Sequence, residues 1–241
     1  MKKENEWICR YDKYAENGTI TDNSYFIQDI WGARKVMENR PTVHYDVGSS
    51  VAGFIAHLLA QKQKIVLIDI RKMTNDFNTP FLNGGGESPS NKQNCGIEYI
   101  QADATNLENI ENESVESISA LCSVEHFGLG RFGDKIEPDA WEKGLKAFQR
   151  VLKKGGRLYF SVPVGQTSKV CFNAHRVFCP ELIIDTLESM DIVEFSYIDG
   201  FGTTICMERK NGKLEIYKDK LDSIPEFKNW GNTGLFEFVK K

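Results

Sequence analysis

Short apolar runs alternate along the chain with segments in which apolar residues recur every three or four positions. The run 65–70 is almost continuously apolar, which is typical of a parallel strand covered on both faces. The apolar positions of 51–59 fall instead on one side of a helix that packs against a sheet. The pattern as a whole predicts seven strands, at 43–47, 65–70, 97–100, 117–122, 158–162, 192–198 and 234–239.

Helical spacing between these strands predicts helices at 25–39, 51–59, 138–152 and 180–190. Pro138 suits the first turn of its helix, and Lys153 with Lys154 suits the negative end of the helix dipole. Gly155 is placed to form a left-handed cap after that helix. Because helices separate the strands, we expect an α/β fold: a doubly wound, mostly parallel, seven-stranded Rossmann-like sheet with helices on both faces.

The chain has 241 residues, which is enough for one well-buried domain and short for two. We therefore expect residues 1–241 to form a single domain. Three segments depart from the regular pattern: an N-terminal helical cap at 1–40, a polar, glycine-rich and flexible insertion at 72–96, and an irregular substrate-side excursion at 201–231.

Composition and charge argue against several partners. The net charge is −4 and the basic residues are scattered, which argues against a nucleic-acid surface. The apolar stretch 47–60 is too short to cross a bilayer, and residues 1–18 lack the apolar core of a signal peptide. The six cysteines show no CxxC spacing, which is typical of free thiols in a reducing compartment. We expect a cytoplasmic protein without nucleic-acid partner or membrane insertion, and leave a homodimer open.

The residues after the first predicted strand distinguish between nucleotide-binding motifs. A phosphate-binding loop requires Lys and a hydroxyl where 54–55 is apolar, and the dinucleotide fingerprint requires glycine at Ser50. An acid and two small residues remain, Asp46, Gly48 and Ser49. Such a turn lets a ligand without pyrophosphate, such as S-adenosylmethionine, lie against the backbone at a helix N-terminus. A tight strand-to-helix turn explains the same residues equally well.

Acidic residues also stand at the ends of the second and third predicted strands. Asp69 comes 23 residues after Asp46, where a carboxylate accepts hydrogen bonds from both ribose hydroxyls, with Ile70 beside it. Asp103 is placed to accept a hydrogen bond from an adenine amino group, and Ala104 leaves flat space beside the ring. Ligands bind beyond the carboxyl ends of the strands in an open α/β sheet, so these three acids predict an adenosine-containing cofactor.

Five segments resemble the class I S-adenosylmethionine-dependent methyltransferases: DVGS, LIDI, QADATNL, SVEH and RVLKKGGRLYFSVP. The resemblance covers residues 43–164, and the chain departs from it at Ser50 and Ala52, where glycines are common in the superfamily. It implies S-adenosylmethionine as the cofactor. The end of the fourth strand would reach the sulfonium group of that cofactor, through Ser123 and Glu125.

A narrower resemblance extends over nearly the whole chain, through SYFIQDIWGAR, DVGSSVAGFIAHLL, EHFGLGRFGD, DAWEKGLKAFQRVLKKGG, VPVG and FNAHRVF. These segments are similar to a domain-of-unknown-function family of bacterial methyltransferase-like proteins that is often associated with cell-surface polysaccharide genes. The resemblance implies binding of S-adenosylmethionine and a carbohydrate acceptor.

Methyl transfer to a hydroxyl requires alignment of donor and acceptor and a base for the acceptor's proton. A neutral imidazole suits this role because its ordinary pKa lies near neutrality. His175, between the fifth strand and the next helix, is the leading candidate base. His126, at the end of the fourth strand, is either a base or part of the cofactor pocket.

Polar residues around the two histidines are candidates for binding the acceptor. Arg131 and Asp134 lie in a glycine-rich loop, where Arg131 would pair with a phosphate or carboxylate. Asn173 and Arg176 flank His175 and would orient a hydroxylated or anionic acceptor. A surface ion pair and a helix-capping cluster explain the two groups as well. No ligand spacing requires a metal, and none is predicted.

The sequence thus predicts an S-adenosylmethionine-dependent methyltransferase that O-methylates a sugar or other small polar acceptor in bacterial surface polysaccharide biosynthesis. One alternative is a protein that binds S-adenosylmethionine without catalysis, because the three acids explain binding alone. The other is a nicotinamide-dependent oxidoreductase. Ser50 at the pyrophosphate position and the lack of a Tyr-x-x-x-Lys pair argue against it.

Overall fold

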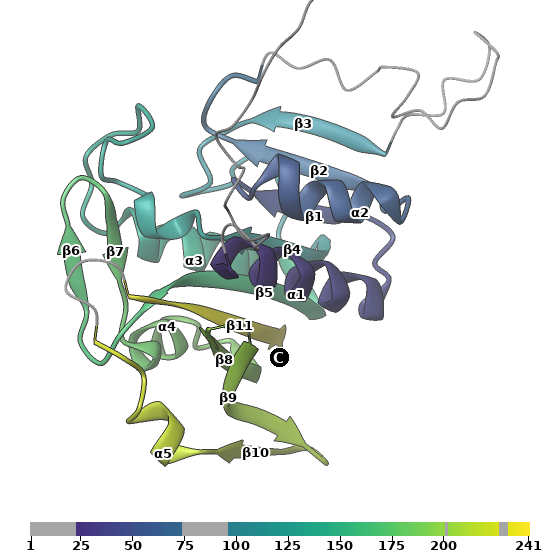
Figure 1. Ribbon diagram of the computed structural model, residues 1–241. Helices are drawn as coiled ribbons and strands as arrows, with labels where there is room; N and C mark the ends of the chain where they lie inside the picture. Colours follow the sequence, from purple (N-terminus) through teal and green to yellow (C-terminus); the bar gives the residue numbers. More distant parts are fainter. Residues whose placement is uncertain (1–22, 74–95, 201, 227–230) are drawn as a thin grey trace, which may run out of the picture.

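A nine-stranded sheet forms the centre of the part of the chain that the structure, a computed structural model, describes: residues 23–73, 96–200, 202–226 and 231–241 (Figure 1). The strand order is β10-β9-β8-β11-β5-β4-β1-β2-β3. The strands are β1 (His44–Val47), β2 (Ile65–Asp69), β3 (Ile97–Gln101), β4 (Val115–Leu121), β5 (Leu152–Val164), β8 (Met190–Asp199), β9 (Gly202–Lys210), β10 (Lys213–Ile216) and β11 (Asn232–Lys240).

The sheet divides into a parallel half and an antiparallel half. Strands β3, β2, β1, β4 and β5 pair in parallel, whereas β11, β8, β9 and β10 continue from β5 in antiparallel pairs. All seven predicted strands are present, as β1 to β5, β8 and β11. The prediction of a seven-stranded, mostly parallel sheet is wrong in that the observed sheet is mixed and carries two further strands.

The two further strands come from the segment predicted as an irregular excursion. Residues 202–216 form β9 and β10, which close the antiparallel edge of the sheet. Polar and charged residues are interspersed along β9, whose burial falls off toward both ends. A strand near an edge does not need the continuous apolar run of a strand buried on both faces, so the pattern gave no strand signal here.

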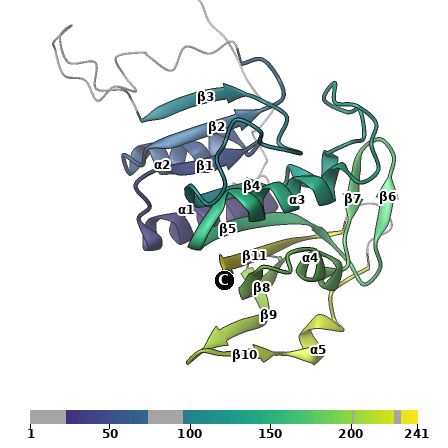
Figure 2. The ribbon, with the colours of Figure 1, turned by 180° about the vertical axis from the view of Figure 1, so that it is seen from behind.

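Helices cover both faces of the sheet, as predicted. On one face lie α1 (Asn23–Asn39), a π-helical turn η1 (Val51–Ile55) and α2 (Ala56–Ala60), and on the other lie α3 (Ala140–Val151) and α4 (Pro180–Thr186) (Figures 1 and 2). Each face has its own apolar core, with Phe54 and Leu58 central to the first and Phe148 and Phe160 central to the second. The remaining elements are the 3₁₀ turn η2 (Val124–His126), the hairpin of β6 (Lys169–Cys171) and β7 (His175–Val177), and α5 (Lys218–Leu221).

Two predicted helix ends are wrong. The helix predicted to end at residue 152 stops at Val151, and β5 begins at once. Gly155 does adopt a left-handed φ of 77°, but inside β5, where the register with β4 shifts, and so forms a strand irregularity instead of a helix cap. Lys153 accordingly pairs with Glu116 of β4 at 2.6 Å. The helix predicted over 180–190 ends at Thr186, and β8 takes up Met190.

Helix α1 is anchored on the antiparallel half of the sheet. Lys35 Nζ lies 2.8 Å from both Glu194 Oε2 of β8 and Glu237 Oε2 of β11. Residues 1–22 of the predicted N-terminal cap and 74–95 of the predicted insertion lie outside the described residues. Among the residues that are described, we find no helix with the length and apolarity that a membrane span requires.

Candidate functional site

A cavity of about 490 Å³ opens at the carboxyl ends of β1 to β4. Tyr25 of α1 and the loop after η2 complete its wall. No residue of 202–226 lines it, so the described part of the predicted excursion contributes nothing to this cavity. Ten predicted site residues line it: Gly48, Ser49, Asp69, Ile70, Asp103, Ala104, Ser123, His126, Arg131 and Asp134.

The turn after β1 is shaped for a close backbone approach. Gly48 has a left-handed φ of 67°, and a Cβ added there would come within 3.2 Å of Ser123 Cβ. Ser50 Oγ accepts a hydrogen bond from the Gly53 N–H at 3.2 Å and caps η1. The serine that departs from the methyltransferase pattern therefore stabilises the turn.

Asp46 lies beneath this turn and does not line the cavity, so its role as a cofactor ligand stays a prediction. It is fully buried, and its Oδ1 accepts hydrogen bonds from Ser49 Oγ at 2.6 Å and Ser119 Oγ at 2.5 Å. Its Oδ2 accepts from the Ser49 N–H at 3.1 Å. Burial raises the pKa of Asp46 to about 6, and these hydrogen bonds oppose the rise. Asp46 thus holds Ser49, which in turn lines the cavity.

The hydrogen-bonded chain continues from Asp46 into the sheet. Ser119 Oγ lies 2.8 Å from His44 Nε2, and His44 Nδ1 lies 2.8 Å from Ser117 Oγ. Because Ser119 donates its proton to the Asp46 carboxylate, it must accept one from His44, which assigns the proton of that ring to Nε2. Burial lowers the pKa of His44 to about 3, so the ring is neutral. His44 is therefore a structural group.

Asp69 ends β2 at the cavity wall, as predicted, but both of its oxygens already have a partner. Arg71 donates to Oδ1 from its backbone N–H at 2.8 Å and from Nε at 3.0 Å, and to Oδ2 from a terminal nitrogen at 2.6 Å. The Arg71 guanidinium also lies 5.1 Å from the centre of the Phe132 ring. Arg71 therefore joins the predicted ribose site to the loop after η2, which the sequence did not show.

Asp103 and Ala104 follow β3 and line the cavity, as predicted. Asp103 Oδ1 accepts a hydrogen bond from the Thr105 N–H at 2.9 Å, which leaves its other carboxylate oxygen available to a ligand. Ala104 is buried. Across the described residues, no group of three or more His, Cys, Asp or Glu side chains is arranged to hold a metal ion.

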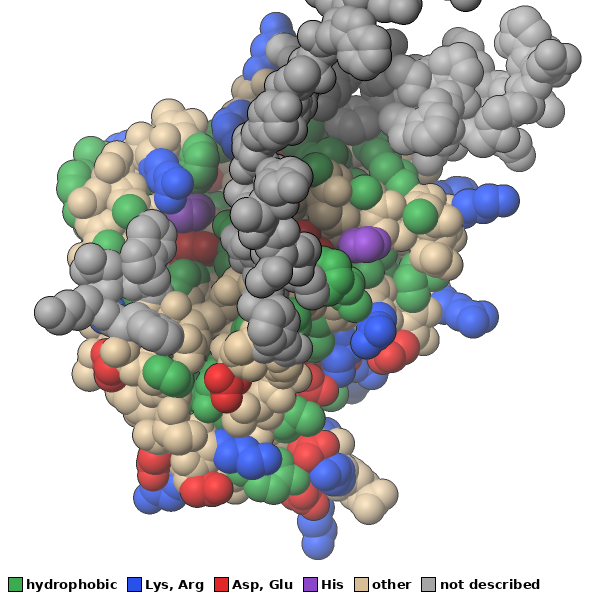
Figure 3. Space-filling view, viewed as in Figure 1, with side chains coloured by type: hydrophobic (Ala, Val, Ile, Leu, Met, Phe, Trp, Pro, Cys, Tyr) green, Lys and Arg blue, Asp and Glu red, His purple; other side chains and the backbone are tan. Residues whose placement is uncertain are grey.

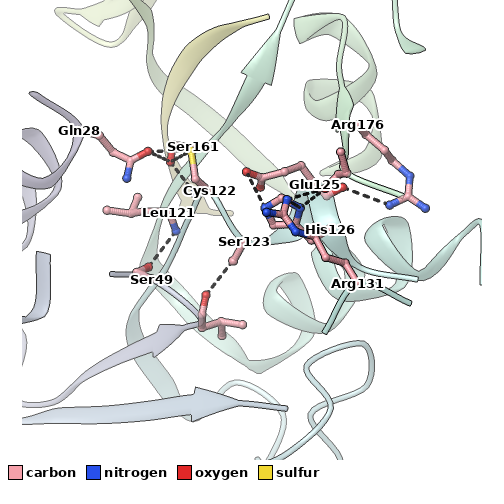
Figure 4. A network of polar contacts seen from close by, with 12 residues as sticks. Gln28, Ser49, Leu121, Cys122, Ser123, Glu125, His126, Arg131, Ser161 and Arg176 are labelled. Carbon is pink, nitrogen blue, oxygen red and sulfur yellow. Dashed lines mark hydrogen bonds and ion pairs between the residues drawn. The ribbon is translucent and has the colours of Figure 1, made fainter. Parts of the chain in front are cut away.

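Cys122, at the end of β4, connects the cavity to α1. Its Sγ donates to Gln28 Oε1 at 2.9 Å, and Ser161 Oγ of β5 donates to the same oxygen at 2.8 Å (Figure 4). Cys122 has a left-handed φ of 50°, which is uncommon for a residue with a side chain. Burial raises the pKa of the thiol well above its usual range, so it stays protonated. The sequence did not single out Cys122 as a site residue.

His126 presents one ring nitrogen as a proton acceptor. Its Nδ1 lies 2.6 Å from the Ala174 carbonyl oxygen, and since a carbonyl only accepts, this nitrogen carries the proton. Its Nε2 is therefore unprotonated in the neutral ring, 3.7 Å from Glu125 Oε1. Burial, together with the nearby charge of Arg131, lowers the pKa of His126 to about 4, although the hydrogen bond to the Ala174 carbonyl opposes the shift. The ring is thus neutral at neutral pH.

Glu125 is buried behind His126 and does not line the cavity, so its role as a cofactor ligand stays a prediction. Its Oε2 has no hydrogen-bond partner among the described residues. Burial raises the pKa of Glu125 to about 8, so the carboxyl is largely protonated at neutral pH. A buried acid thus stands next to a cavity-lining histidine (Figure 4).

The loop after η2 is fixed by backbone contacts. Asp134 accepts from the N–H groups of Gly130 at 3.2 Å and Phe132 at 3.1 Å, so this acid holds the loop although it also lines the cavity. Gly128 has a φ of 70°, and a Cβ there would collide with the Glu137 carbonyl oxygen. Arg131 donates to the Ala174 carbonyl at 2.8 Å, beside the same contact of His126.

Hairpin β6–β7 supports the site from behind. His175 and Arg176 are buried in β7, Asn173 is exposed in the turn before it, and none of the three lines the cavity, so their roles toward the acceptor stay predictions. Arg176 donates to the carbonyl oxygens of Phe127 at 2.5 Å and Pro138 at 3.2 Å. Strand-end reasoning placed the hairpin at the correct end of the sheet, but it did not show that β7 is buried along its whole length.

The chain was compared with protein families and with known proteins. A family model described as "Caenorhabditis protein of unknown function, DUF268" matches residues 98–234, more than half of the chain. The ubiquinone/menaquinone biosynthesis C-methyltransferase UbiE of Klebsiella pneumoniae is 33% identical over 129 residues, which are 52% of this chain and 47% of UbiE. This chain therefore spans about half the length of the curated relatives it matches.

Solved structures of methyltransferases share the fold. The 1,6-didemethyltoxoflavin-N1-methyltransferase of Burkholderia thailandensis, solved with S-adenosylhomocysteine, has a TM-score of 0.57 and 14% identity over 90% of this chain and 79% of its own. The [4+2]-cyclase SpnF has a TM-score of 0.58 and 11% identity over 88% and 81%. The fold is therefore that of the S-adenosylmethionine-dependent methyltransferases, and a cyclase shares it, so the fold alone does not determine the reaction.

Proposed function

The chain belongs to the family described as Caenorhabditis protein of unknown function, DUF268, and we propose that it is an S-adenosylmethionine-dependent methyltransferase. The observation that carries the proposal is the placement of Asp69, Asp103 and the Gly48 turn around one cavity, at the ends of three neighbouring strands. The methyltransferase fold of the solved neighbours and the similarity to UbiE support it.

The residues at the three strand ends fit the proposed cofactor. Asp69 would accept from the ribose hydroxyls, with Arg71 as the group that has to share or release its oxygens. Asp103 would accept from the adenine amino group through its available oxygen, between Ile70 and Ala104. Ser49 and Gly48 would approach the amino-acid part of the cofactor. When bound, S-adenosylmethionine supplies an electrophilic methyl group.

We assign the base to His126 in preference to His175. His126 lines the cavity and has an unprotonated Nε2, whereas His175 is buried in β7 outside the cavity lining. A proton taken up by Nε2 would make an imidazolium, and its charge would be stabilised in the fraction of molecules in which the Glu125 carboxyl, 3.7 Å away, is already ionised. Arg131 would bind the acceptor at the same end of the cavity.

For the acceptor, we propose a sugar or another small polar molecule that is O-methylated in bacterial surface polysaccharide biosynthesis, in the cytoplasm. This part of the proposal rests on the resemblance of the sequence and on the polar residues beside His126. A second function, binding of S-adenosylmethionine without methyl transfer, is kept because the cyclase SpnF shares the fold. A nicotinamide-dependent reaction is disfavoured because Ser50, which caps η1, stands at the pyrophosphate glycine position.

Calorimetry with S-adenosylhomocysteine and, in parallel, NADH tests the proposal. We expect micromolar binding of S-adenosylhomocysteine alone. Asp69→Asn removes charge-assisted hydrogen bonds of about 1.5–3 kcal/mol each, so its affinity falls by at least roughly tenfold. Asp199→Asn, which changes the exposed acid at the end of β8, is the matched control and leaves the affinity unchanged. Wild-type protein that binds NADH or neither ligand would overturn the proposal.

A further inference from the structure

Large apolar side chains are exposed around the mouth of the cavity. Eight such side chains are exposed among the described residues, and four of them lie on two short segments: Phe132 (39% exposed) and Ile136 (63%) after η2, and Val170 (59%) and Phe172 (69%) in hairpin β6–β7. Soluble proteins rarely gather exposed apolar groups without a binding role. This concentration therefore marks a binding surface.

The two segments form one surface. His126 and Arg131, from the side of η2, both bond to the carbonyl oxygen of Ala174, at the end of the turn that carries Phe172. The tip of the hairpin lies beside the loop after η2 in both ribbon views (Figures 1 and 2). In the space-filling view, hydrophobic side chains surround a basic and a histidine side chain at the upper left (Figure 3). We call residues 130–136 and 170–174 the rim.

The rim also carries two exposed basic side chains. Arg131 and Lys135 are exposed, line the cavity and have no ion-pair partner within the described ranges. The nearby acids are already engaged. Asp134 binds backbone N–H groups of its own loop, and Glu137 pairs with Lys143 at 2.7 Å. Exposed apolar groups next to unpaired cations complement a surface that is both apolar and anionic.

We propose that the rim docks the protein on an anionic lipid surface, with the cavity open toward an acceptor carried by that surface. The apolar side chains would enter the boundary between headgroups and acyl chains, while Arg131 and Lys135 meet the phosphates. A small neutral sugar in solution would need none of the four exposed apolar groups. Docking on a lipid surface does not depend on methyl transfer. Only the identity of the acceptor rests on the proposed function.

Co-sedimentation with lipid vesicles tests the inference. The full chain, loaded with S-adenosylhomocysteine, is mixed with vesicles of phosphatidylcholine alone or with 30% phosphatidylglycerol, roughly the charge density at which juxtamembrane cations are attracted. We expect binding to the anionic vesicles that weakens with salt. The double variant Ile136→Ser, Phe172→Ser reduces the bound fraction by at least roughly tenfold, and Lys135→Glu by several-fold, because each removes one of the two attractions.

Ile216→Ser is the matched control, because Ile216 is 56% exposed on β10 at the opposite edge of the sheet. It should bind vesicles like the wild type. Equal binding by the double variant, or no vesicle binding by wild-type protein that does bind S-adenosylhomocysteine, overturns the inference and leaves the proposed function standing. Light scattering tests whether the rim binds a second copy of this chain instead of lipid. A wild-type dimer that the double variant converts to a monomer would also overturn the inference.

Discussion

The turn after β4 and hairpin β6–β7 lie at the same end of the sheet, and each contributes a histidine, an arginine and a nearby polar residue. In the turn, His126 faces the cavity, with Nε2 free to accept a proton. In the hairpin, His175 is buried and Arg176 is committed to backbone carbonyls. The two regions therefore have different roles. The turn after β4 presents side chains to a ligand, and hairpin β6–β7 holds that turn in place.

The difference arises from the backbone each region uses. The turn after β4 leaves its strand through the left-handed Cys122 and the short η2, which directs His126 into the cavity. The hairpin is a pair of short extended strands, and its second strand, β7, is buried along its whole length, so its side chains are held inside the protein. A polar residue at a ligand-facing strand end is thus a site candidate only if the chain turns there.

The largest expected effect separates the two histidines. If methyl transfer is detected, His126→Gln lowers kcat by roughly 10²–10⁴-fold because the general base is lost. Its affinity for S-adenosylhomocysteine stays within about threefold, since the ring is not a predicted cofactor ligand. The measurement is transfer of labelled methyl to a panel of sugars and sugar nucleotides. His175→Gln is the matched variant, and a loss of kcat there as large as in His126→Gln, with the fold intact, would reverse the assignment.

A smaller effect separates the two arginines. Arg176→Met leaves the partly buried carbonyls of Phe127 and Pro138 without this hydrogen-bond donor and lowers the free energy of unfolding by about 1–3 kcal/mol. Arg131→Met changes an exposed side chain, and the free energy falls by less than about 1 kcal/mol. Urea unfolding followed by circular dichroism measures both values. Similar values for the two variants would contradict the division between supporting and presenting regions.

The smallest effect concerns the buried acid behind His126. The pKa of Glu125 is raised to about 8 in the folded protein from an ordinary value of 4.5, so the folded state binds more protons between these values. Stability from this group is therefore present at low pH and is lost as the pH rises through 8. Glu125→Gln removes this pH dependence. Between pH 5 and 8 the free energy of unfolding should therefore fall less in the variant than in the wild type, with a difference on the order of 2 kcal/mol.

Urea unfolding at several pH values measures this change. Glu188→Gln, at an exposed position after α4, is the control and keeps the wild-type dependence. A wild-type slope in Glu125→Gln would mean that the carboxyl is not buried as described.

Residues 43–71 and 97–104 show what the sequence could predict. The run of β2 is continuously apolar because both of its faces are covered, so its end was visible, and with it Asp69 at the cavity. Gly48 and Asp103 were found because they follow the shorter predicted strands β1 and β3. The same reasoning placed Asp46 at the cavity, but Asp46 does not line it. Asp46 lies within β1, one residue before the strand ends, and its side chain bonds to Ser49 beneath the turn. The position of a strand's end predicts at which end of the sheet a residue lies. The alternation of side chains along the strand then determines whether that side chain faces the cavity.

The other parts of the site depend on contacts between residues that are far apart in the sequence, and a local sequence pattern does not predict such contacts. The partnership of Arg71 with Asp69 is close in sequence, but its contact with Phe132 joins segments that follow different strands. Gln28 reaches Cys122 from α1, a helix whose polar positions look like an ordinary exposed face until the helix is packed. Strands β9 and β10 were missed for a related reason, because β9 is placed by its pairing with β8, and β10 by its pairing with β9.

Gly128 has a consequence for anyone who wishes to redesign this protein. Its left-handed backbone lies against the carbonyl of Glu137, so even an alanine would push the loop after η2 off the start of α3. Directed evolution of acceptor preference should therefore keep Gly128 constant and randomise positions 131, 132, 135 and 136. A Cβ at Gly133 would meet no atom within 4 Å, which offers an entry point for side chains that tolerate a positive φ, such as asparagine.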